Sequence, residues 1–215
     1  MRVVRRLLVF ALLLALVGAG AALAARGDPQ KKINPADQAR AKAMLLRQAD
    51  FWPGFKAERS SGEYEYYCKA LDESDLVLTG EAESPDFTAG FITVASISQV
   101  YATAAMANTS WRRGTSPVGV ACLAAGWRSL ARKEGLEFVS FRRVPFPSVA
   151  PRTVAFRIIV TANGVRVVTD LVGMMHSRAH AGLYFVSALA PIPKGEQVGY
   201  ARIVAGRMSK AMRGA

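Results

Sequence analysis

The strongest constraint on the fold is a predicted β-hairpin in the C-terminal half of the chain. Two runs rich in β-branched and apolar residues, 154–160 and 165–169, flank the dipeptide Asn163-Gly164. Asn-Gly accepts positive φ at both central positions of a two-residue turn and is typical of a tight hairpin. Strands joined in this way pair antiparallel, whereas parallel strands need a long crossover connection. We therefore expect a sheet built largely from antiparallel strands.

Helices are expected on both sides of this hairpin in the sequence. Asn34-Pro35 is a typical helix start, with Asn as the cap and Pro in the first turn, and the helix should run to about residue 48. Its buried face is predicted to carry Ala39, Ala43 and Leu46. The other expected elements are a helix from Ser116-Pro117 to Gly135, a last amphipathic helix at 196–213, a helix capped by Ser96 or Ser98, strands at 64–68, 76–79, 91–94, 136–144 and 183–189, an extended connection at 145–151, and a polar loop at 176–182.

This order of elements predicts an α+β protein. Helices and strands occur in separate runs, and the last strands form an antiparallel meander. Roughly 190 residues remain after the N-terminal segment described below, which suits one domain with a real core. We expect a single α+β domain at 34–215, with an antiparallel β-sheet packed with helices.

Residues 1–24 predict a secretory signal peptide. A basic start with Arg2, Arg5 and Arg6 precedes an apolar run at 7–17 and a stretch of small residues. The triplet that ends at Ala24 fits signal peptidase, so the mature chain is expected to begin at Ala25, with a short polar tether at 25–33. The alternative is an uncleaved membrane anchor, because the apolar segment approaches the ~20 residues that span a bilayer. Either way we expect a secreted or extracytoplasmic protein of the cell envelope.

The chain is strongly basic, which bears on its partners. Its formal net charge is +12 at pH 7, and three of these charges lie in the predicted signal, so +9 remains afterwards. Such a surplus attracts polyanions and anionic surfaces. Outside the cytoplasm an anionic membrane or an acidic cell-wall polymer is expected rather than nucleic acid. The alternative is a compositional effect of a GC-rich genome, since the arginines are scattered rather than clustered.

Two cysteines, Cys68 and Cys122, lie in the predicted mature chain. An even pair in an oxidising compartment favours a disulfide, and closing so long a loop is worth about 4 kcal/mol in chain-entropy terms. A cysteine nucleophile would need a free thiol and a nearby histidine. We expect the structural bridge.

Few residues suggest catalysis or metal binding. His176 and His180 have metal-ligand spacing, with Asp170 the nearest carboxylate, but they fall in the predicted polar loop, where a solvated role is favoured. Glu81, Glu83 and Asp86 would serve as acid or base only in a cleft, and a solvated turn is the simpler interpretation. The hydrolase motif Gly-x-Ser-x-Gly is absent from the sequence. We expect no metal or other cofactor, and a protein that is not an enzyme.

Two further features suggest binding surfaces. Phe51, Trp52 and Phe55 surround a Pro-Gly turn and form either a binding lip or a plug over one edge of the core, with the plug favoured. The cationic face of the last predicted helix is either an anionic-surface contact or simply the solvated side of a packed helix, with the second favoured.

Several short segments together resemble exported actinobacterial domains that include the mycobacterial lipoprotein LpqN family. These segments are Leu45-Leu46-Arg47-Gln48-Ala49-Asp50 with Pro53-Gly54-Phe55, Leu71-Asp72-Glu73-Ser74-Asp75-Leu76 with Thr79-Gly80, Val100-Tyr101-Ala102, Cys122-Leu123-Ala124, Phe146-Pro147, Thr153-Val154-Ala155-Phe156-Arg157 and Leu183-Tyr184-Phe185. The resemblance implies a PsbP-like sandwich, an antiparallel sheet between helices, that acts as a binding or accessory module. Lipoproteins of that group carry a lipidated cysteine after the signal, and this chain has none there.

The expected function is therefore that of an exported, non-catalytic binding or accessory domain at the cell envelope. Its ligand would be apolar and lipid-like, or a glycan, held on a concave apolar site. The first alternative is a secreted hydrolase with a cleft that places His176 or His180 beside a carboxylate. The second alternative is adhesion to anionic envelope polymers through the basic surface.

Overall fold

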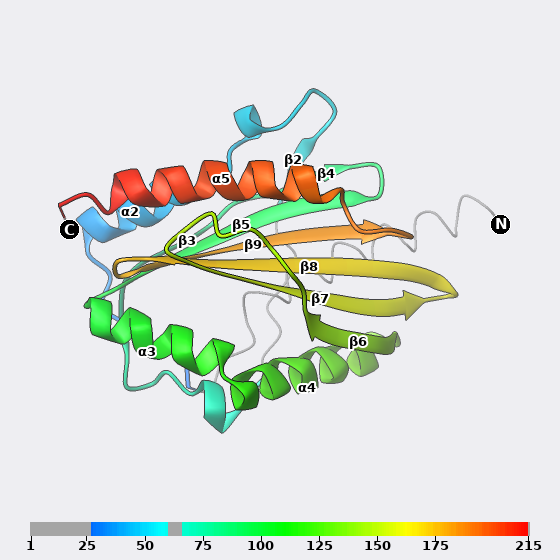
Figure 1. Cartoon of the computed structure of the whole chain (residues 1–215), viewed down its shortest axis with the longest axis horizontal. Coiled ribbons are helices and arrows are strands. Elements are labelled where there is room, and N and C mark those ends of the chain that lie inside the picture. Colours follow the sequence, from blue (N-terminus) through cyan, green and yellow to red (C-terminus); the bar gives the residue numbers. More distant parts are fainter. Residues whose placement is uncertain (1–26, 60–65, 215) are drawn as a thin grey trace.

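The computed structural model describes residues 27–59 and 66–214, and a nine-stranded sheet organises them (Figure 1). The main strand order is β1-β3-β5-β9-β8-β7-β6, with β4 paired to both β5 and β2. The strands are β1 (Gln30–Lys31), β2 (Lys56–Glu58), β3 (Val77–Glu83), β4 (Asp86–Ala89), β5 (Ile92–Tyr101), β6 (Glu137–Arg143), β7 (Arg152–Ala162), β8 (Val165–His176) and β9 (Ala179–Ala188). The α-helices are α2 (Pro35–Met44), α3 (Ala104–Thr115), α4 (Pro117–Lys133) and α5 (Lys194–Ala211), with short 3₁₀ turns η1 (Gln48–Asp50) and η2 (Lys69–Leu71).

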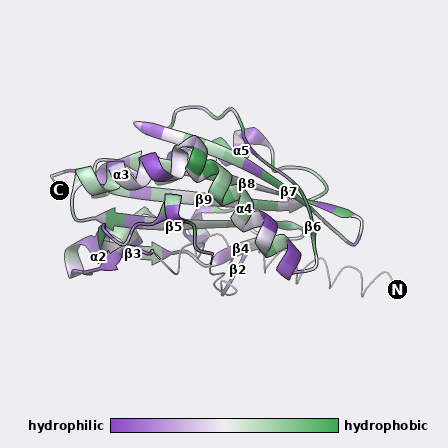
Figure 2. Ribbon diagram, turned by 90° about the horizontal axis from the view of Figure 1, so that it is seen from below, coloured by the Kyte–Doolittle hydropathy of each residue, from purple (hydrophilic) through white to green (hydrophobic). Residues whose placement is uncertain are grey.

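The helices lie in two layers, one on each side of the sheet. In Figure 1, α2 and α5 lie above the sheet and α3 and α4 lie below it. We call these sides the α2/α5 face and the α3/α4 face. Met44 of α2 and Met208 of α5 belong to one buried cluster, and Trp127 of α4 belongs to another. Figure 2 shows the strands mainly hydrophobic in the middle of the sheet, where these clusters lie. The α+β class and the sheet packed with helices are confirmed.

The predicted hairpin at Asn163-Gly164 is present. Asn163 and Gly164 have φ of 50° and 76°, and the register pairs Ala162 with Val165 across the turn. The prediction of a two-residue turn with positive φ at both centres is thus confirmed. The strands are longer than expected, however, and β8 continues to His176.

The predicted start of α4 is also confirmed. Ser116 caps the helix, since its Oγ accepts a hydrogen bond of 3.0 Å from the Gly119 N–H, and Pro117 occupies the first turn. The helix ends before Gly135, whose φ is 68°. The extended connection from β6 to β7 and the last helix are likewise present where the sequence predicts them.

The buried face predicted for α2 is wrong at Ala39, whereas Ala43 is half-buried and Leu46 is buried just beyond the end of the helix. The helix starts at Pro35 as expected, with the Asn34 side chain accepting from the Asp37 N–H, but it ends at Met44. Its buried residues are Asp37, Ala41 and Met44, whereas Ala39 is exposed. A carboxylate on the buried side is not expected from hydrophobic periodicity, because its burial depends on a partner far away in the sequence.

Four other predictions need correction. Ser96 and Ser98 lie inside β5 and cap no helix; Thr103 caps α3 instead. Residues 81–86 do not form one turn, because β3 runs to Glu83 and β4 begins at Asp86. Residues 66–68 form no strand, and 64–65 lie outside the described residues. The loop at 176–182 contracts to Ser177 and Arg178, since β8 and β9 extend to either side of them.

The N-terminal predictions fall mostly outside the described residues, which begin at Gly27, so Ala24, Ala25 and the rest of the signal are not described. Part of the predicted tether is a strand. The Gln30 N–H donates to the Leu76 carbonyl and the Lys32 N–H donates to the Leu78 carbonyl, both at 2.8 Å. Strand β1 therefore pairs parallel with β3. Within the described residues, no helix is long and apolar enough to span a membrane.

Candidate functional site

A pocket of about 270 Å³ lies where the first turn of α5 meets the edge of the sheet. Strands β6 and β7, the connection between them and the start of α5 supply its walls. The lining residues are Arg142, Val144, Pro145, Phe146, Arg157, Lys194 and Gln197. Cationic and apolar side chains therefore share one small cavity.

Two of the cations come from directly opposed positions on neighbouring strands. Arg142 of β6 is paired in register with Arg157 of β7, and Arg157 with Asp170 of β8. Directly opposed residues lie on the same face, with Cβ atoms about 5 Å apart. On the α2/α5 face, three neighbouring strands thus present Arg142, Arg157 and Asp170 side by side. This row contains two guanidinium groups and one carboxylate.

The Asp170 carboxylate is fully engaged by its neighbours. Arg157 donates from Nε and Nη2 to its two oxygens, at 2.7 and 2.8 Å. The Gln197 amide of α5 donates to Asp170 Oδ2 at 2.7 Å and to the Ile192 carbonyl at 2.8 Å. Asp170 is only 2% exposed, so this network holds Arg157 in a fixed position at the base of the pocket. The carboxylate raises the pKa of Arg157, which stays protonated.

Two further cations add charge that Asp170 does not balance. Arg142 is exposed on the edge strand β6. Lys194, the first residue of α5, donates to the Pro145 carbonyl and lies 5.8 Å from the centroid of the Phe146 ring. The lining of the pocket and Asp170 together carry three cations and one anion, a surplus of two positive charges. Val144 and Phe146 pack partly buried beside these charges. The arrangement suits an anionic group attached to an apolar or ring-shaped body.

The structure does not bring the two histidines together. Met175 packs on the α3/α4 face and is paired with His180, so His176, the next residue of β8, points to the opposite face. Asp170 is bound to Arg157 as described. The solvated-loop interpretation is wrong for His180, because β9 carries it into the core.

His180 instead belongs to a buried cluster beneath α3. Its Nε2 lies 2.9 Å from the Ala107 carbonyl, and its ring contacts those of Tyr101 and Trp111 at centroid distances of 4.9 and 5.8 Å. Burial lowers the pKa of His180 to about 4, so the ring is neutral at pH 7 and its Nε2–H donates to the carbonyl. This arrangement is that of a structural histidine.

A network of polar groups lies next to this cluster. The Tyr101 hydroxyl is within 3.0 Å of Glu73 Oε2 and 2.8 Å of Ser110 Oγ. Burial raises the pKa of Tyr101 and of Glu73. This network was not predicted from the sequence, because its residues come from three separate segments of the chain.

The three acidic residues assigned to a solvated turn have different environments. Glu81 forms a 2.6 Å ion pair with Lys31 of β1. Asp86 is completely buried, and neither of its carboxylate oxygens has a hydrogen-bond partner. Burial, with Glu58 and Glu83 nearby, raises the pKa of Asp86 to about 6. Among the described residues, no group of three or more His, Cys, Asp or Glu side chains could hold a metal ion.

The aromatic group divides into a buried and an exposed part. Phe51 and Phe55 pack in the core cluster of the α2/α5 face, with ring centroids 4.8 Å apart, as a plug would. Trp52 remains 57% exposed and contacts Phe55 edge-on.

The expected disulfide between Cys68 and Cys122 is present. Its two Cα atoms are 6.1 Å apart, within the usual range for a bridge. It attaches the segment before η2 to the outer layer formed by α4.

No family model matches the chain, and a search of curated proteins finds no similar sequence.

The pocket was not predicted from the sequence. One signal was available, since Arg142 and Arg157 lie in two strands that were both predicted. Their alignment, however, depends on the register of those strands.

Proposed function

We propose that this protein is an exported binding module whose pocket holds a ligand with an anionic group, a phosphate or a carboxylate, on an apolar or glycan body. The observation that carries the proposal is the surplus of two positive charges around a 270 Å³ pocket that also has an apolar wall. Arg157 is already oriented by Asp170, so a ligand would meet at least one fixed cation.

The residues of the pocket favour binding over catalysis. Arginine and lysine stay protonated near neutral pH, so they stabilise negative charge but exchange no protons there. The one carboxylate, Asp170, is occupied by Arg157 and Gln197. The hydrolase alternative, a cleft with a histidine beside a carboxylate, gains no support from the environment of His180.

Export and the family resemblance are part of the same proposal. The predicted signal peptide and the disulfide both fit an oxidising, extracytoplasmic compartment. The sheet between two helix layers supports the resemblance to LpqN-like, PsbP-like domains. Export with cleavage implies a secreted protein that begins at Ala25, and an intact mass that retains Met1 would rule out that cleavage.

The binding proposal can be tested with three ligands that share one hexyl chain. Hexyl phosphate, hexyl glucoside and hexyltrimethylammonium would be titrated by calorimetry into the chain of residues 25–215. We expect hexyl phosphate to bind and hexyltrimethylammonium not to bind. Hexyl glucoside should bind more weakly than hexyl phosphate or not at all. Equal binding of all three, or binding of the cation alone, would overturn the proposal.

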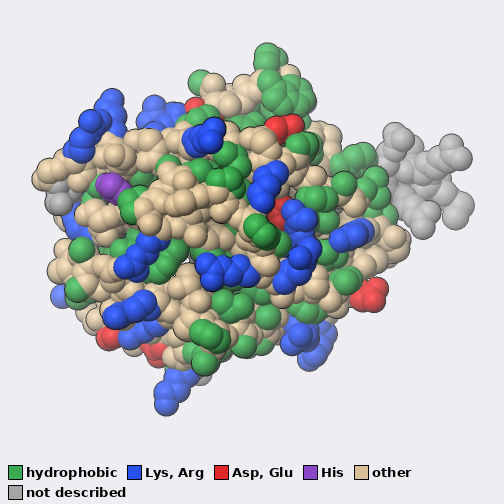
Figure 3. Space-filling model, viewed as in Figure 1, with side chains coloured by type: hydrophobic (Ala, Val, Ile, Leu, Met, Phe, Trp, Pro, Cys, Tyr) green, Lys and Arg blue, Asp and Glu red, His purple; other side chains and the backbone are tan. Residues whose placement is uncertain are grey.

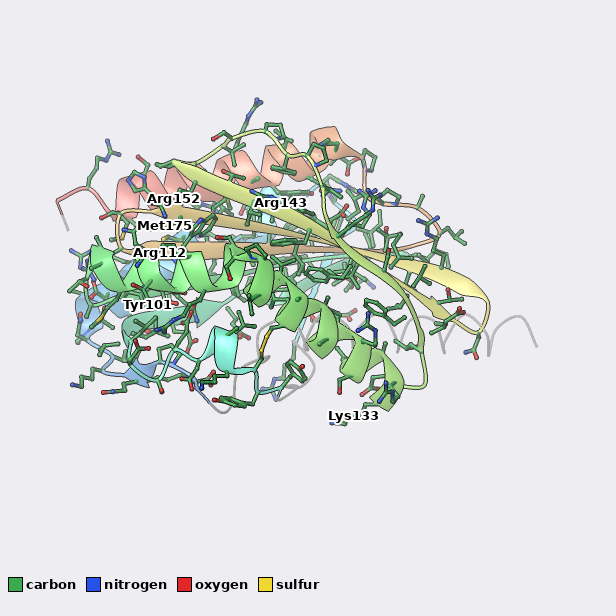
Figure 4. The ribbon with its side chains drawn as sticks, turned by 60° about the horizontal axis from the view of Figure 1, so that its bottom comes forward. Tyr101, Arg112, Lys133, Arg143, Arg152 and Met175 are labelled. Carbon is green, nitrogen blue, oxygen red and sulfur yellow. A yellow bond between two sulfur atoms is a disulfide. The ribbon has the colours of Figure 1, made fainter. Side chains whose placement is uncertain are left out.

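A second candidate function is adhesion to an anionic polymer. Figure 3 shows many Lys and Arg side chains across the face seen in Figure 1, and few acidic ones. Figure 4 shows Arg112 and Arg152 near Met175 at one end of the sheet, Arg143 nearer the middle of the view, and Lys133 at the far end of α4. Adhesion of this kind should be lost when salt is raised from 0.05 to 0.5 M, and retention on immobilised polyphosphate at high salt would contradict it.

A further inference from the structure

Two large apolar side chains project from adjacent turns at one end of the sheet. Leu189 directly follows β9 and is 70% exposed, and Phe91 precedes β5 and is 44% exposed. The Ala188 N–H donates to the Phe91 carbonyl at 3.3 Å, so the two turns are joined. The end of β9 and the turn between β4 and β5 lie toward the right of Figure 1.

The backbone of Leu189 has an unusual conformation. Its φ is 74°, a region that side chains other than glycine rarely adopt. Two hydrogen bonds hold it there: the Leu189 N–H donates to the Arg166 carbonyl at 2.7 Å, and the Ala190 N–H donates to the Ala188 carbonyl at 3.0 Å. Glycine would fit this backbone better, and a polar residue would suit the exposure better. A strained, exposed leucine is therefore unfavourable for folding, and such outliers concentrate at functional positions.

A cationic side chain lies beside these two residues. Arg166 is exposed on β8, and its backbone carbonyl accepts a hydrogen bond from the Leu189 N–H. Glu137 lies two strands away from Arg166 in register, since both oppose Thr161. Lys194 begins α5 five residues beyond Leu189, but its Nζ donates to the Pro145 carbonyl in the pocket, and Glu196 is exposed two residues further on. Arg166 is therefore the cation that the contacts place at this tip.

We propose that this end of the protein docks onto an anionic lipid bilayer. Leu189 and Phe91 enter the boundary between headgroups and acyl chains, and Arg166 binds a headgroup phosphate. Two side chains on projecting turns form a narrow wedge, which suits insertion into a fluid interface. A protein partner would instead need a broad complementary face. The net charge of +9 expected for the mature chain favours an anionic partner.

Docking in this way would also place the pocket near the headgroups. Asp170 is paired with Phe185, and Leu189 lies four positions after Phe185 in the chain. At about 3.3 Å per residue, that separation is roughly 13 Å along the strand. The docking proposal does not depend on the ligand of the pocket, however, and uses different residues.

The test is flotation of the chain of residues 25–215 with lipid vesicles in 0.1 M salt. Vesicles of phosphatidylglycerol and phosphatidylcholine in equal parts would be compared with phosphatidylcholine alone. We expect binding to the anionic vesicles only. Leu189→Gly should bind about tenfold more weakly, because an inserted leucine is lost, yet melt at the same or a higher temperature, because the backbone strain is relieved. Arg166→Gln should bind about fivefold more weakly.

Val118→Ala is the matched control. Val118 is 64% exposed in the first turn of α4, away from the proposed tip, so its loss should leave vesicle binding unchanged. Failure of the wild-type protein to bind anionic vesicles would overturn the proposal. That result is expected if this surface binds a protein partner instead of a bilayer. Full binding by Leu189→Gly would overturn it too. If Arg142→Gln abolished vesicle binding while Leu189→Gly did not, the pocket and not the tip would hold the lipid.

Discussion

Arg178 and Asp37 form a two-pronged ion pair that joins the β8–β9 turn to helix α2. Arg178 Nη1 and Nη2 donate to the two Asp37 oxygens at 2.8 and 2.7 Å, although 141 residues separate the pair. Arg178 also donates to the Tyr101 carbonyl at 2.9 Å, and Arg40 donates to Asp37 Oδ1 at 2.6 Å. The Arg178 guanidinium holds the pKa of Asp37 well below its usual range. One buried carboxylate therefore fixes α2 against the sheet.

Removal of Arg178 should be strongly destabilising. Arg178→Met leaves Asp37 buried with only Arg40 as a cationic partner, and we expect a loss of about 3 kcal/mol in urea unfolding at pH 7. The loss should shrink as the pH falls into the range where Asp37 protonates, because its lowered pKa contributes stability only above that range. The matched variant Arg40→Met removes the more exposed partner and should cost less than about 1 kcal/mol. Equal costs for the two variants would contradict this description of the pair.

Asp86 should make the protein less stable as the pH rises. Its pKa of about 6 in the folded state exceeds that of an unfolded aspartate, so the folded state binds more protons between about pH 4 and 6, and stability falls with pH in that window. Asp86→Asn should therefore gain about 2 to 3 kcal/mol relative to wild type between pH 4 and 7. Urea unfolding at several pH values measures this gain.

His180 should have the opposite pH dependence. Its pKa of about 4 in the folded state lies below that of an unfolded histidine, so the unfolded state binds more protons between about pH 4 and 6.5. Stability contributed by neutral His180 is lost as the pH falls through that window. His180→Phe should be about 1 kcal/mol less stable than wild type at pH 7, because the hydrogen bond to Ala107 is lost. Between pH 7 and pH 4 the difference in stability should change by about 3 kcal/mol in favour of the variant. A constant difference across this range would show that His180 can be protonated within the fold.

The disulfide should contribute substantially to stability. Its half-cystines are 54 residues apart, and a loop of that length is worth about 4 kcal/mol in chain-entropy terms. The double variant Cys68→Ser with Cys122→Ser should unfold at correspondingly lower urea concentration. Thiol labelling of the denatured, unreduced wild type should detect no free thiol, and labelling of both cysteines would refute the bridge.

Local signals were sufficient to predict much of the fold from the sequence. Ser116-Pro117 starts α4 and Asn163-Gly164 turns the hairpin because in both cases the decisive hydrogen bonds or dihedral angles involve neighbouring residues. The disulfide followed from the number of cysteines and the expected compartment.

The errors arise where a polar side chain forms its hydrogen bond or ion pair with a residue that is distant in the sequence. Ser96 and Ser98 were interpreted as helix caps, but Ser96 Oγ accepts from the Leu46 N–H and Ser98 Oγ donates to the Ala41 carbonyl, both across about 50 residues of chain. Those bonds bury two hydroxyls in the middle of β5. The burial of Asp37 has the same origin in Arg178.

The candidate pocket was unpredictable for a related reason. Arg142 opposes Arg157 only because β6 has an irregularity between Phe138 and Ser140 that shifts its register by one residue. A shift of one residue reverses the face of every later side chain, and the sequence carries no clear mark of the shift. Gln197 of α5, which donates to Asp170, is buried, and hydrophobic periodicity does not predict the burial of a polar side chain.

The most direct test of the proposed pocket compares Arg142→Gln with Arg202→Gln, an exposed cation elsewhere on α5, in calorimetric titrations with hexyl phosphate. Arg142 opposes another arginine, so Arg142→Gln should fold with equal or slightly higher stability, by up to about 1 kcal/mol. It should nevertheless bind hexyl phosphate about tenfold more weakly, as loss of one charge-assisted hydrogen bond implies. Arg202→Gln should bind like wild type. Unchanged affinity in Arg142→Gln, or an equal loss in both variants, would show that the anionic ligand binds elsewhere.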